Sequence, residues 1–326
     1  MSDGGLTVLD GTRLKAVDLS LPVFYDTVAG AKVLELAESK ASSALFGLSL
    51  PGNVKSSALK RLDVDPISFR RTELDRDQAS SKLKNYVTAI TDELNDDPLV
   101  VAILDGKTLR LFMEDEDDFA MLAENLFIDL DIEDKGKISK NEIRNALVHM
   151  GVEMGIPPFS EFPLLNEILK KHGAEGEEEL GQAQFAQLLQ PVLQELVDAL
   201  AEKHVVVIQN IKVINGSKLR KLLASEKQLN DVIEKILQEK HNEKDGEKST
   251  EIIRSYLEIN GKELGLPPSK ADESVALLYN AVFADVVNGK SATGLENDDL
   301  GVLLKEILEK FAEQLEANPV FHNLGN

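Results

Sequence analysis

Apolar residues recur every three to four positions on both sides of a short polar stretch near the middle of the chain. Residues 119–130 read FAMLAENLFIDL and residues 143–150 read IRNALVHM, a spacing typical of helices with one buried face. The twelve residues between them, 131–142, read DIEDKGKISKNE and are almost entirely polar. The pattern therefore predicts a helix over 119–130, a twelve-residue loop, and a second helix over 140–150.

The predicted loop places oxygen-bearing groups at the spacing of a calcium loop. A Ca²⁺ ion prefers about six to eight oxygen ligands, and such loops supply them from positions 1, 3, 5, 7, 9 and 12. The candidate ligands here are Asp131, Glu133, the carbonyl of Lys137, Ser139 and Glu142. Gly136 at position 6 permits the positive φ that turns the backbone toward the metal. The spacing predicts a Ca²⁺ site in this loop.

Position 5 departs from this pattern. Lys135 stands there, and an ammonium group donates hydrogen bonds but cannot ligate a cation. With three carboxylates left, the expected Kd for Ca²⁺ is on the order of 10⁻⁵ M or weaker. Two interpretations follow: a loop that binds Ca²⁺ weakly, or a loop that keeps the helix–loop–helix shape and binds no metal.

The chain repeats itself with a spacing of 110 residues. The sequence DGKTLR at 105–110 recurs as NGSKLR at 215–220, and MGIPP at 154–158 recurs as LGLPP at 264–268. A fainter copy of the opening motif, VLDGTRL, lies at 8–14. We expect a helical or irregular N-terminal region over 1–84, repeated units over 85–200 and 205–316, and a tail over 317–326.

Within the N-terminal region, helical spacing covers 27–41 and 54–62, and a further helix is predicted over 81–94. The polar stretch 63–81 predicts a loop or linker.

Each repeated unit is expected to hold two helix–loop–helix elements. In the first unit, a helix over 161–172, the loop 173–184 and a helix from Phe185 form the second element. That loop lacks carboxylates at positions 1 and 12, so it predicts a structural partner whose Leu180 pairs with Ile138 in a short β-bridge. Loops 241–252 and 288–299 of the second unit also lack a complete ligand set.

The segment 119–150 closely resembles the EF-hand superfamily, and a weaker resemblance extends over 115–315. The phrases LFGLSLPGNVKSSALKRL at 45–62 and GIPPFSEFPLLNEILKKHG at 155–173 are similar to a plant family of uncharacterised EF-hand calcium-binding proteins. The resemblance implies an all-α fold of tandem EF-hand pairs, Ca²⁺ as the cofactor, and no enzymatic activity.

The amino-acid composition limits the classes of partner and the cellular location that we expect. The formal net charge of −21 argues against nucleic acid, because phosphates would be repelled. Cysteine is absent, no signal-peptide pattern opens the chain, and no apolar run reaches the about 20 residues of a membrane span, so a cytoplasmic protein is expected. No nucleophile, phosphate-binding loop or histidine cluster points to an enzyme. The leading hypothesis is a calcium sensor or modulator that acts on an unknown protein target. The alternative is a calcium-independent helical scaffold for protein–protein interaction.

Overall fold

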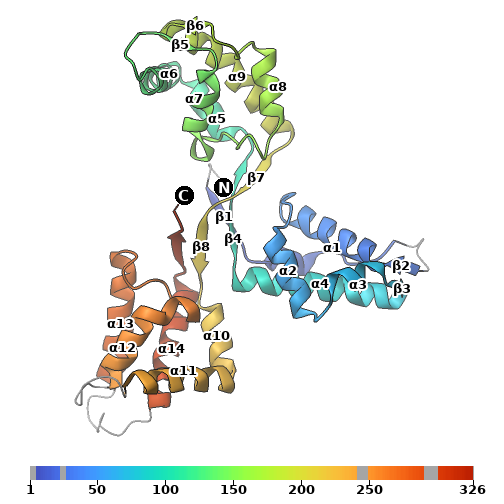
Figure 1. Cartoon of the computed structure of the whole chain (residues 1–326), viewed down its shortest axis with the longest axis vertical. Helices are drawn as coiled ribbons and strands as arrows, with labels where there is room; N and C mark the ends of the chain where they lie inside the picture. The colour runs from blue at the N-terminus through green and yellow to red at the C-terminus, as the bar shows by residue number, and fades with distance from the viewer. Residues whose placement is uncertain (1–4, 23–26, 241–248, 290–299, 326) are drawn as a thin grey trace. The chain divides into compact units, whose positions relative to one another are not determined.

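The computed structural model describes residues 5–22, 27–240, 249–289 and 300–325. Helices account for most of these residues, as the all-α prediction requires, and the described strands form four small sheets (Figure 1). The chain divides into two compact units. The first comprises Met1–Leu9, Glu38–Leu50 and Val100–Gln209, and the second comprises Asp10–Ala37, Pro51–Leu99 and Asn210–Asn326. Within the described residues, no helix is both long and apolar enough to cross a bilayer.

The first unit contains the predicted helix–loop–helix elements. Its helices are α5 (Lys107–Glu114), α6 (Glu116–Leu130), α7 (Glu142–Met150), α8 (Leu164–Lys171) and α9 (Gln182–Glu202), with a 3₁₀ turn η2 (Val152–Met154). Helix α6 begins three residues earlier than predicted because Asp115 caps it, accepting hydrogen bonds from the backbone N–H groups of Asp117 and Asp118 at 3.0 and 3.1 Å. The acidic residues of 114–118 thus lie at the start of α6, where Asp115 caps the helix.

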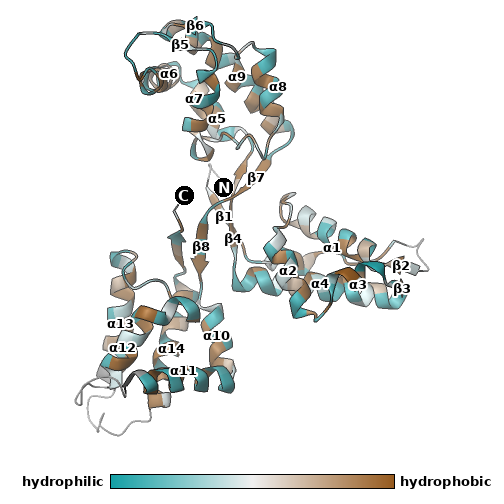
Figure 2. Cartoon of the chain, in the orientation of Figure 1, coloured by the Kyte–Doolittle hydropathy of each residue, from teal (hydrophilic) through white to brown (hydrophobic). Residues whose placement is uncertain are grey.

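The first unit also holds a three-stranded sheet in the order β1 (Leu6–Leu9), β4 (Leu99–Leu104) and β7 (Val205–Ile208). Strands β4 and β7 are antiparallel, with Ala102 opposite Val207. Both strands are hydrophobic along their length (Figure 2), and most of β4 is buried. These strands open and close the segment that contains α5 to α9.

The second unit draws helices from both ends of the chain. From the N-terminal region it takes η1 (Thr12–Ala16), β2 (Thr27–Ala29), the start of α1 (Gly30–Ala44), α2 (Gly52–Arg61), α3 (Pro66–Arg71), β3 (Glu73–Asp75) and α4 (Arg76–Asp96). From the C-terminal region it takes β8 (Ile211–Ile214), α10 (Ser217–Ala224), α11 (Glu226–Lys240), α12 (Ser249–Leu264), α13 (Glu273–Gly289), α14 (Leu300–Ala317) and β9 (Val320–Asn323).

Two sequence predictions for this unit were wrong. Residues 63–81 are not a linker: Asp65 caps α3, whose first residue is Pro66, and Asp75 forms a capping box with Gln78 at the start of α4. Residues 317–326 are not simply a tail, because β9 pairs antiparallel with β8, placing Phe321 opposite Val213. In both cases short polar or partly exposed segments are fixed by specific hydrogen bonds, which hydrophobic periodicity does not report.

Three glycines in repeated positions make the same tight contact. Gly11, Gly106 and Gly216 have φ values of 79°, 80° and 77°, a region that side chains with a Cβ rarely adopt. A Cβ on each would approach a carbonyl oxygen of the last long helix of its own segment. Those oxygens belong to Thr91, Val197 and Ala312, at 2.7, 2.7 and 2.8 Å. The N-terminal region therefore carries a third copy of the turn that opens the two repeated units.

The residue before each glycine closes the turn in the same way. Its side-chain oxygen accepts a hydrogen bond from the backbone N–H two residues later. The pairs are Asp10 with Thr12 at 2.9 Å, Asp105 with Lys107 at 3.1 Å, and Asn215 with Ser217 at 3.2 Å. Asp and Asn suit this position because their short side chains reach their own backbone. The repeated DG and NG pairs are thus structural.

Candidate metal-binding loop

The loop 131–142 folds around the side chain of its first residue. Helix α6 ends at Leu130, and the Asp131 backbone N–H still donates to the carbonyl of Phe127 at 2.9 Å. The Asp131 carboxylate then accepts hydrogen bonds from the backbone N–H groups of Lys135 at 3.0 Å and Gly136 at 2.6 Å. These bonds reverse the backbone, with φ of 68° at Gly136. Asp131 therefore organises the loop before any cation is considered.

Glu142 stands at the other end of the loop, as the first residue of α7. Its Oε2 accepts a hydrogen bond from the Asn145 side chain at 2.8 Å. Ser139 lies in the two-residue strand β5 (Ile138–Ser139). The structure thus places the predicted ligands at the end of α6, along the loop, and at the start of α7.

The second helix–loop–helix element of this unit braces the loop. Strand β5 pairs antiparallel with β6 (Glu179–Leu180), and Ile138 lies opposite Leu180, so the predicted β-bridge is confirmed. Both side chains are buried, at 6% exposure each. The backbone N–H of Lys140 also donates to the carbonyl of Glu178 at 2.9 Å. These contacts therefore join the two loops into one pair.

Asn141 adds a contact that the sequence did not reveal. Its side chain donates to the Glu177 carboxylate at 2.8 Å and accepts from the Gly176 backbone N–H at 2.8 Å. The Lys140 ammonium pairs with the Glu178 carboxylate. Part of the acidic run at 175–179 thus binds the first loop. The only sequence signal was the acidic run itself, which does not name its partners.

Lys135 is paired within the loop. Its ammonium contacts the Glu133 carboxylate, and both side chains are about two-thirds exposed, at 65% and 67%. The hydrogen bond that Lys135 donates to the Glu133 carboxylate, followed by the negative charge of that carboxylate, raises the pKa of Lys135 above its usual value. Glu133, predicted to ligate a cation from position 3, therefore has an ammonium group as its present partner.

The predicted ligands are of the chemical type that a hard cation prefers. It offers three carboxylates, a hydroxyl and a carbonyl, all oxygen donors of the type that Ca²⁺ prefers. Among the residues that the structure describes, no three carboxylate or imidazole side chains converge as a metal-binding group. Holding a cation here requires Glu133 to exchange its bond with Lys135, and Glu142 its bond with Asn145, for the ion.

Of the three other predicted loops, only the loop 173–184 lies wholly within the described residues. Loop 173–184 begins with Gly173, at φ of 65°, and its acidic side chains at 177 and 178 already bind Asn141 and Lys140. Residues 241–248 and 290–299 lie outside the described residues, so the predictions for loops 241–252 and 288–299 stay predictions.

Comparison with known proteins adds no relative: no protein-family model, no curated protein and no solved structure matches this chain.

Proposed function

We propose that this protein binds Ca²⁺ through the loop 131–142 and acts as a sensor or modulator of the EF-hand type. The observation that carries the proposal is the fold of the loop around Asp131, whose carboxylate collects the N–H groups of Lys135 and Gly136. The bridge between Ile138 and Leu180 supports it, because paired loops of this kind are how EF-hands occur together. Asp131, Glu133, the carbonyl of Lys137, Ser139 and Glu142 would hold the ion.

Bound Ca²⁺ would supply a positive charge shared by carboxylates at two helix ends. Asp131 follows the last residue of α6 and Glu142 is the first residue of α7. Drawing these carboxylates together changes the angle between the two helices, as in sensor EF-hands. Apolar side chains on the same helices are exposed: Met121 at 59%, Ile128 at 60% and Val148 at 59%. We propose that a protein target reads this surface.

Titration calorimetry with Ca²⁺ tests the proposal. The wild type should release or absorb heat with a midpoint weaker than about 10⁻⁵ M, given Lys135 in the loop. Glu142→Gln should abolish that signal, because the amide cannot give two charged oxygens. Glu124→Gln is the matched control: it removes the same charge from an exposed position of α6 outside the loop. Equal binding by the wild type and Glu142→Gln would rule out the loop as the site.

A calcium-independent interaction scaffold is the second candidate. The ion pair between Lys135 and Glu133 favours it, because it satisfies a carboxylate that Ca²⁺ would need. A ligand that binds only the folded state raises the melting temperature. Melting the protein with EDTA and with excess Ca²⁺ separates the two functions: a higher Tm with Ca²⁺ supports the sensor, and identical curves support the scaffold.

A further inference from the structure

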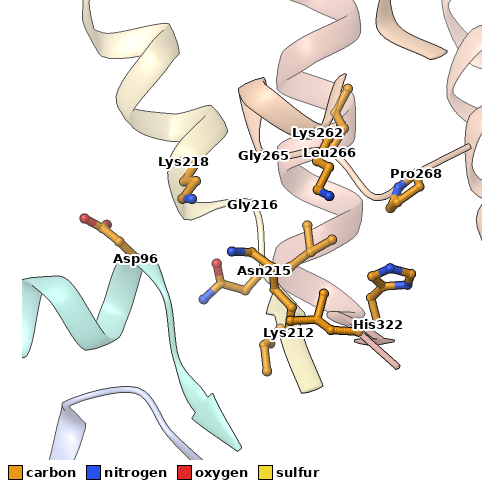
Figure 3. Close-up of a pocket in the computed structure, with 13 residues that line it drawn as sticks. Asp96, Lys212, Asn215, Gly216, Lys218, Lys262, Gly265, Leu266, Pro268 and His322 are labelled. Carbon is orange, nitrogen blue, oxygen red and sulfur yellow. The ribbon is translucent and has the colours of Figure 1, made fainter. Parts of the chain in front are cut away.

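A pocket with basic walls lies in the second unit, at the turn that opens its C-terminal repeat. It is bounded by β8 and β9, the Gly216 turn, the start of α10 and the segment after α12 (Figure 3). Four side chains that are or can become cationic line it: Lys212, Lys218, Lys262 and His322. In a chain with a formal charge of −21, such a cluster is unexpected.

Two of these side chains face each other across a strand pair. Lys212 of β8 lies opposite His322 of β9. Like charges directly opposite in an antiparallel pair are destabilising, so this pairing needs a nearby anion when both are charged. Asp97 supplies one to Lys212, at 3.2 Å, with both side chains partly exposed.

Lys218 and Lys262 have no ion-pair partner within the described part of the chain. In Figure 3 the two lysines lie on either side of the Gly216 turn. Gly265 packs closely against Lys218: a Cβ on Gly265, at φ of 93°, would lie 2.6 Å from the Lys218 Cβ. Helix α10 begins at Ser217, so the positive end of its dipole adds to the same wall.

The first repeat shows that the framework does not require these charges. Its strand pair places Ala102 opposite Val207, where the second repeat has Lys212 opposite His322. The positions 110 residues before Lys218 and Lys262 are Thr108 and Val152. A Cβ added at Gly155 would lie 3.6 Å from the Thr108 Cβ, at the position that corresponds to Gly265 and Lys218. Four neutral positions of one repeat are thus three lysines and a histidine in the other.

The rest of the pocket is mostly apolar. Ile214 and Leu266 are buried, at 8% and 1% exposure, and Pro268 and Leu324 lie beside them. Asp96 also lines the pocket, but its Oδ2 is already paired with Arg61, at 2.5 Å, and with Lys221. Its Oδ1 is buried and has no hydrogen-bond partner among the described residues. A ligand here meets the exposed Lys218 and Lys262, whereas Ile214, Leu266 and Asp96 Oδ1 are covered by the protein itself.

We propose that this pocket binds a small organic phosphate. Its phosphate would lie against Lys218 and Lys262 at the start of α10, with Lys212 and His322 contributing further charge. Several ammonium groups and a helix N-terminus suit a dianion better than a singly charged carboxylate. The carbon skeleton would extend from the phosphate toward solvent, because Ile214 and Leu266 are buried.

Equilibrium dialysis of the full chain with phenyl phosphate tests the proposal, with phenol as the uncharged analogue and inorganic phosphate as competitor. The wild type should bind phenyl phosphate, inorganic phosphate should compete with it, and phenol should not bind. The double variant Lys218→Thr, Lys262→Val carries the residues of the first repeat and should lose about tenfold or more in affinity. Lys235→Gln, an exposed lysine of α11 outside the pocket, is the charge control.

A circular dichroism melt of each variant checks folding, and the single variants Lys218→Gln and Lys262→Gln replace the double variant if it does not fold. Each single change should weaken phenyl phosphate binding, while Lys235→Gln leaves it unchanged. No binding by the wild type at millimolar phenyl phosphate, or equal binding by wild type and the lysine variants, would overturn the proposal. Binding of phenol as tight as that of phenyl phosphate would do the same.

Discussion

The first and last repeats share a framework but differ in the chemistry that they carry. Both open on a glycine with φ near 80° packed against a helix carbonyl, and both join two helices through an arginine–asparagine hydrogen bond. Those bonds are Arg144 to Asn166 and Arg254 to Asn280. The first repeat has oxygen donors in the loop 131–142, whereas the last has lysines around a pocket. The shared fold depends on a few positions, such as the glycine turns, where the backbone conformation restricts the residue type. Residues at other positions can differ between the repeats and provide different binding groups.

The strongest test of a shared framework is the glycine turn. Gly106→Ala and Gly216→Ala should each destabilise the protein by about 3 kcal/mol, because the Cβ adds a clash with a backbone carbonyl to the cost of positive φ. Gly173→Ala is the control: its φ is 65°, but nothing lies within 4 Å of the added Cβ, so a loss of about 1 kcal/mol is expected. Urea unfolding measures both. Equal losses at all three positions would show that the contacts do not matter.

A single substitution in the loop 131–142 of the first repeat should raise its affinity for Ca²⁺. Lys135→Asp removes an ammonium and supplies a carboxylate at position 5, so Ca²⁺ affinity should rise by about tenfold. Lys170→Asp, on the exposed side of α8, makes the same charge change outside the loop and should leave the affinity within about twofold. Calorimetry compares them. An equal gain from both variants would mean that net charge, not the ligand position, sets the affinity.

The core of the second repeat buries a tyrosine where the first repeat has a leucine. Tyr279 of α13 is 1% exposed, and its hydroxyl donates to the carbonyl of Pro267 at 3.1 Å. The position that precedes Asn166, as Tyr279 precedes Asn280, is the buried apolar Leu165. Tyr279→Phe should cost about 1 kcal/mol, because the Pro267 carbonyl loses its partner. Chemical denaturation gives the value, and an unchanged free energy of unfolding would show that this bond contributes nothing.

The smallest expected effect concerns acid stability in the first unit. Lys171, hydrogen-bonded to Glu195 at 2.8 Å, and then His172 lower the pKa of that carboxyl below 4.5. A lowered carboxyl pKa stabilises the fold above the unfolded value and loses that contribution as pH falls through the folded pKa. Stability measured between pH 6 and pH 3 should therefore fall less steeply in Glu195→Gln. Parallel curves for variant and wild type would contradict this.

Sequence reasoning found the elements whose residues recur at a regular spacing. The helices around the loop 131–142 have buried apolar faces, and the 110-residue repeat marks corresponding turns. It missed α3, none of whose residues is buried, because capping by Asp65 rather than periodicity defines that helix. It also missed β9, because a short strand needs a partner, here β8, that lies about a hundred residues away in sequence.

The two candidate sites were not equally visible. The ligands of the metal loop all lie within the twelve residues 131–142, so their spacing in the sequence is enough to predict them. Lys212, Lys262 and His322 lie far apart in the chain, and only the pairing of β8 with β9 and the packing of α12 bring them to one pocket. Aligning the repeats would have shown the change from Thr108 to Lys218, but not which residues surround it.

The amide resonance of Gly136 gives the most direct test of the calcium proposal. Its N–H donates to the Asp131 carboxylate at 2.6 Å, so a cation on that carboxylate must shift the resonance. In a Ca²⁺ titration followed by ¹⁵N–¹H NMR, the Gly136 peak should move and saturate together with that of Ile138, and Glu142→Gln should prevent the movement. Peaks of Gly136 and Ile138 that stay in place at millimolar Ca²⁺ would contradict the account.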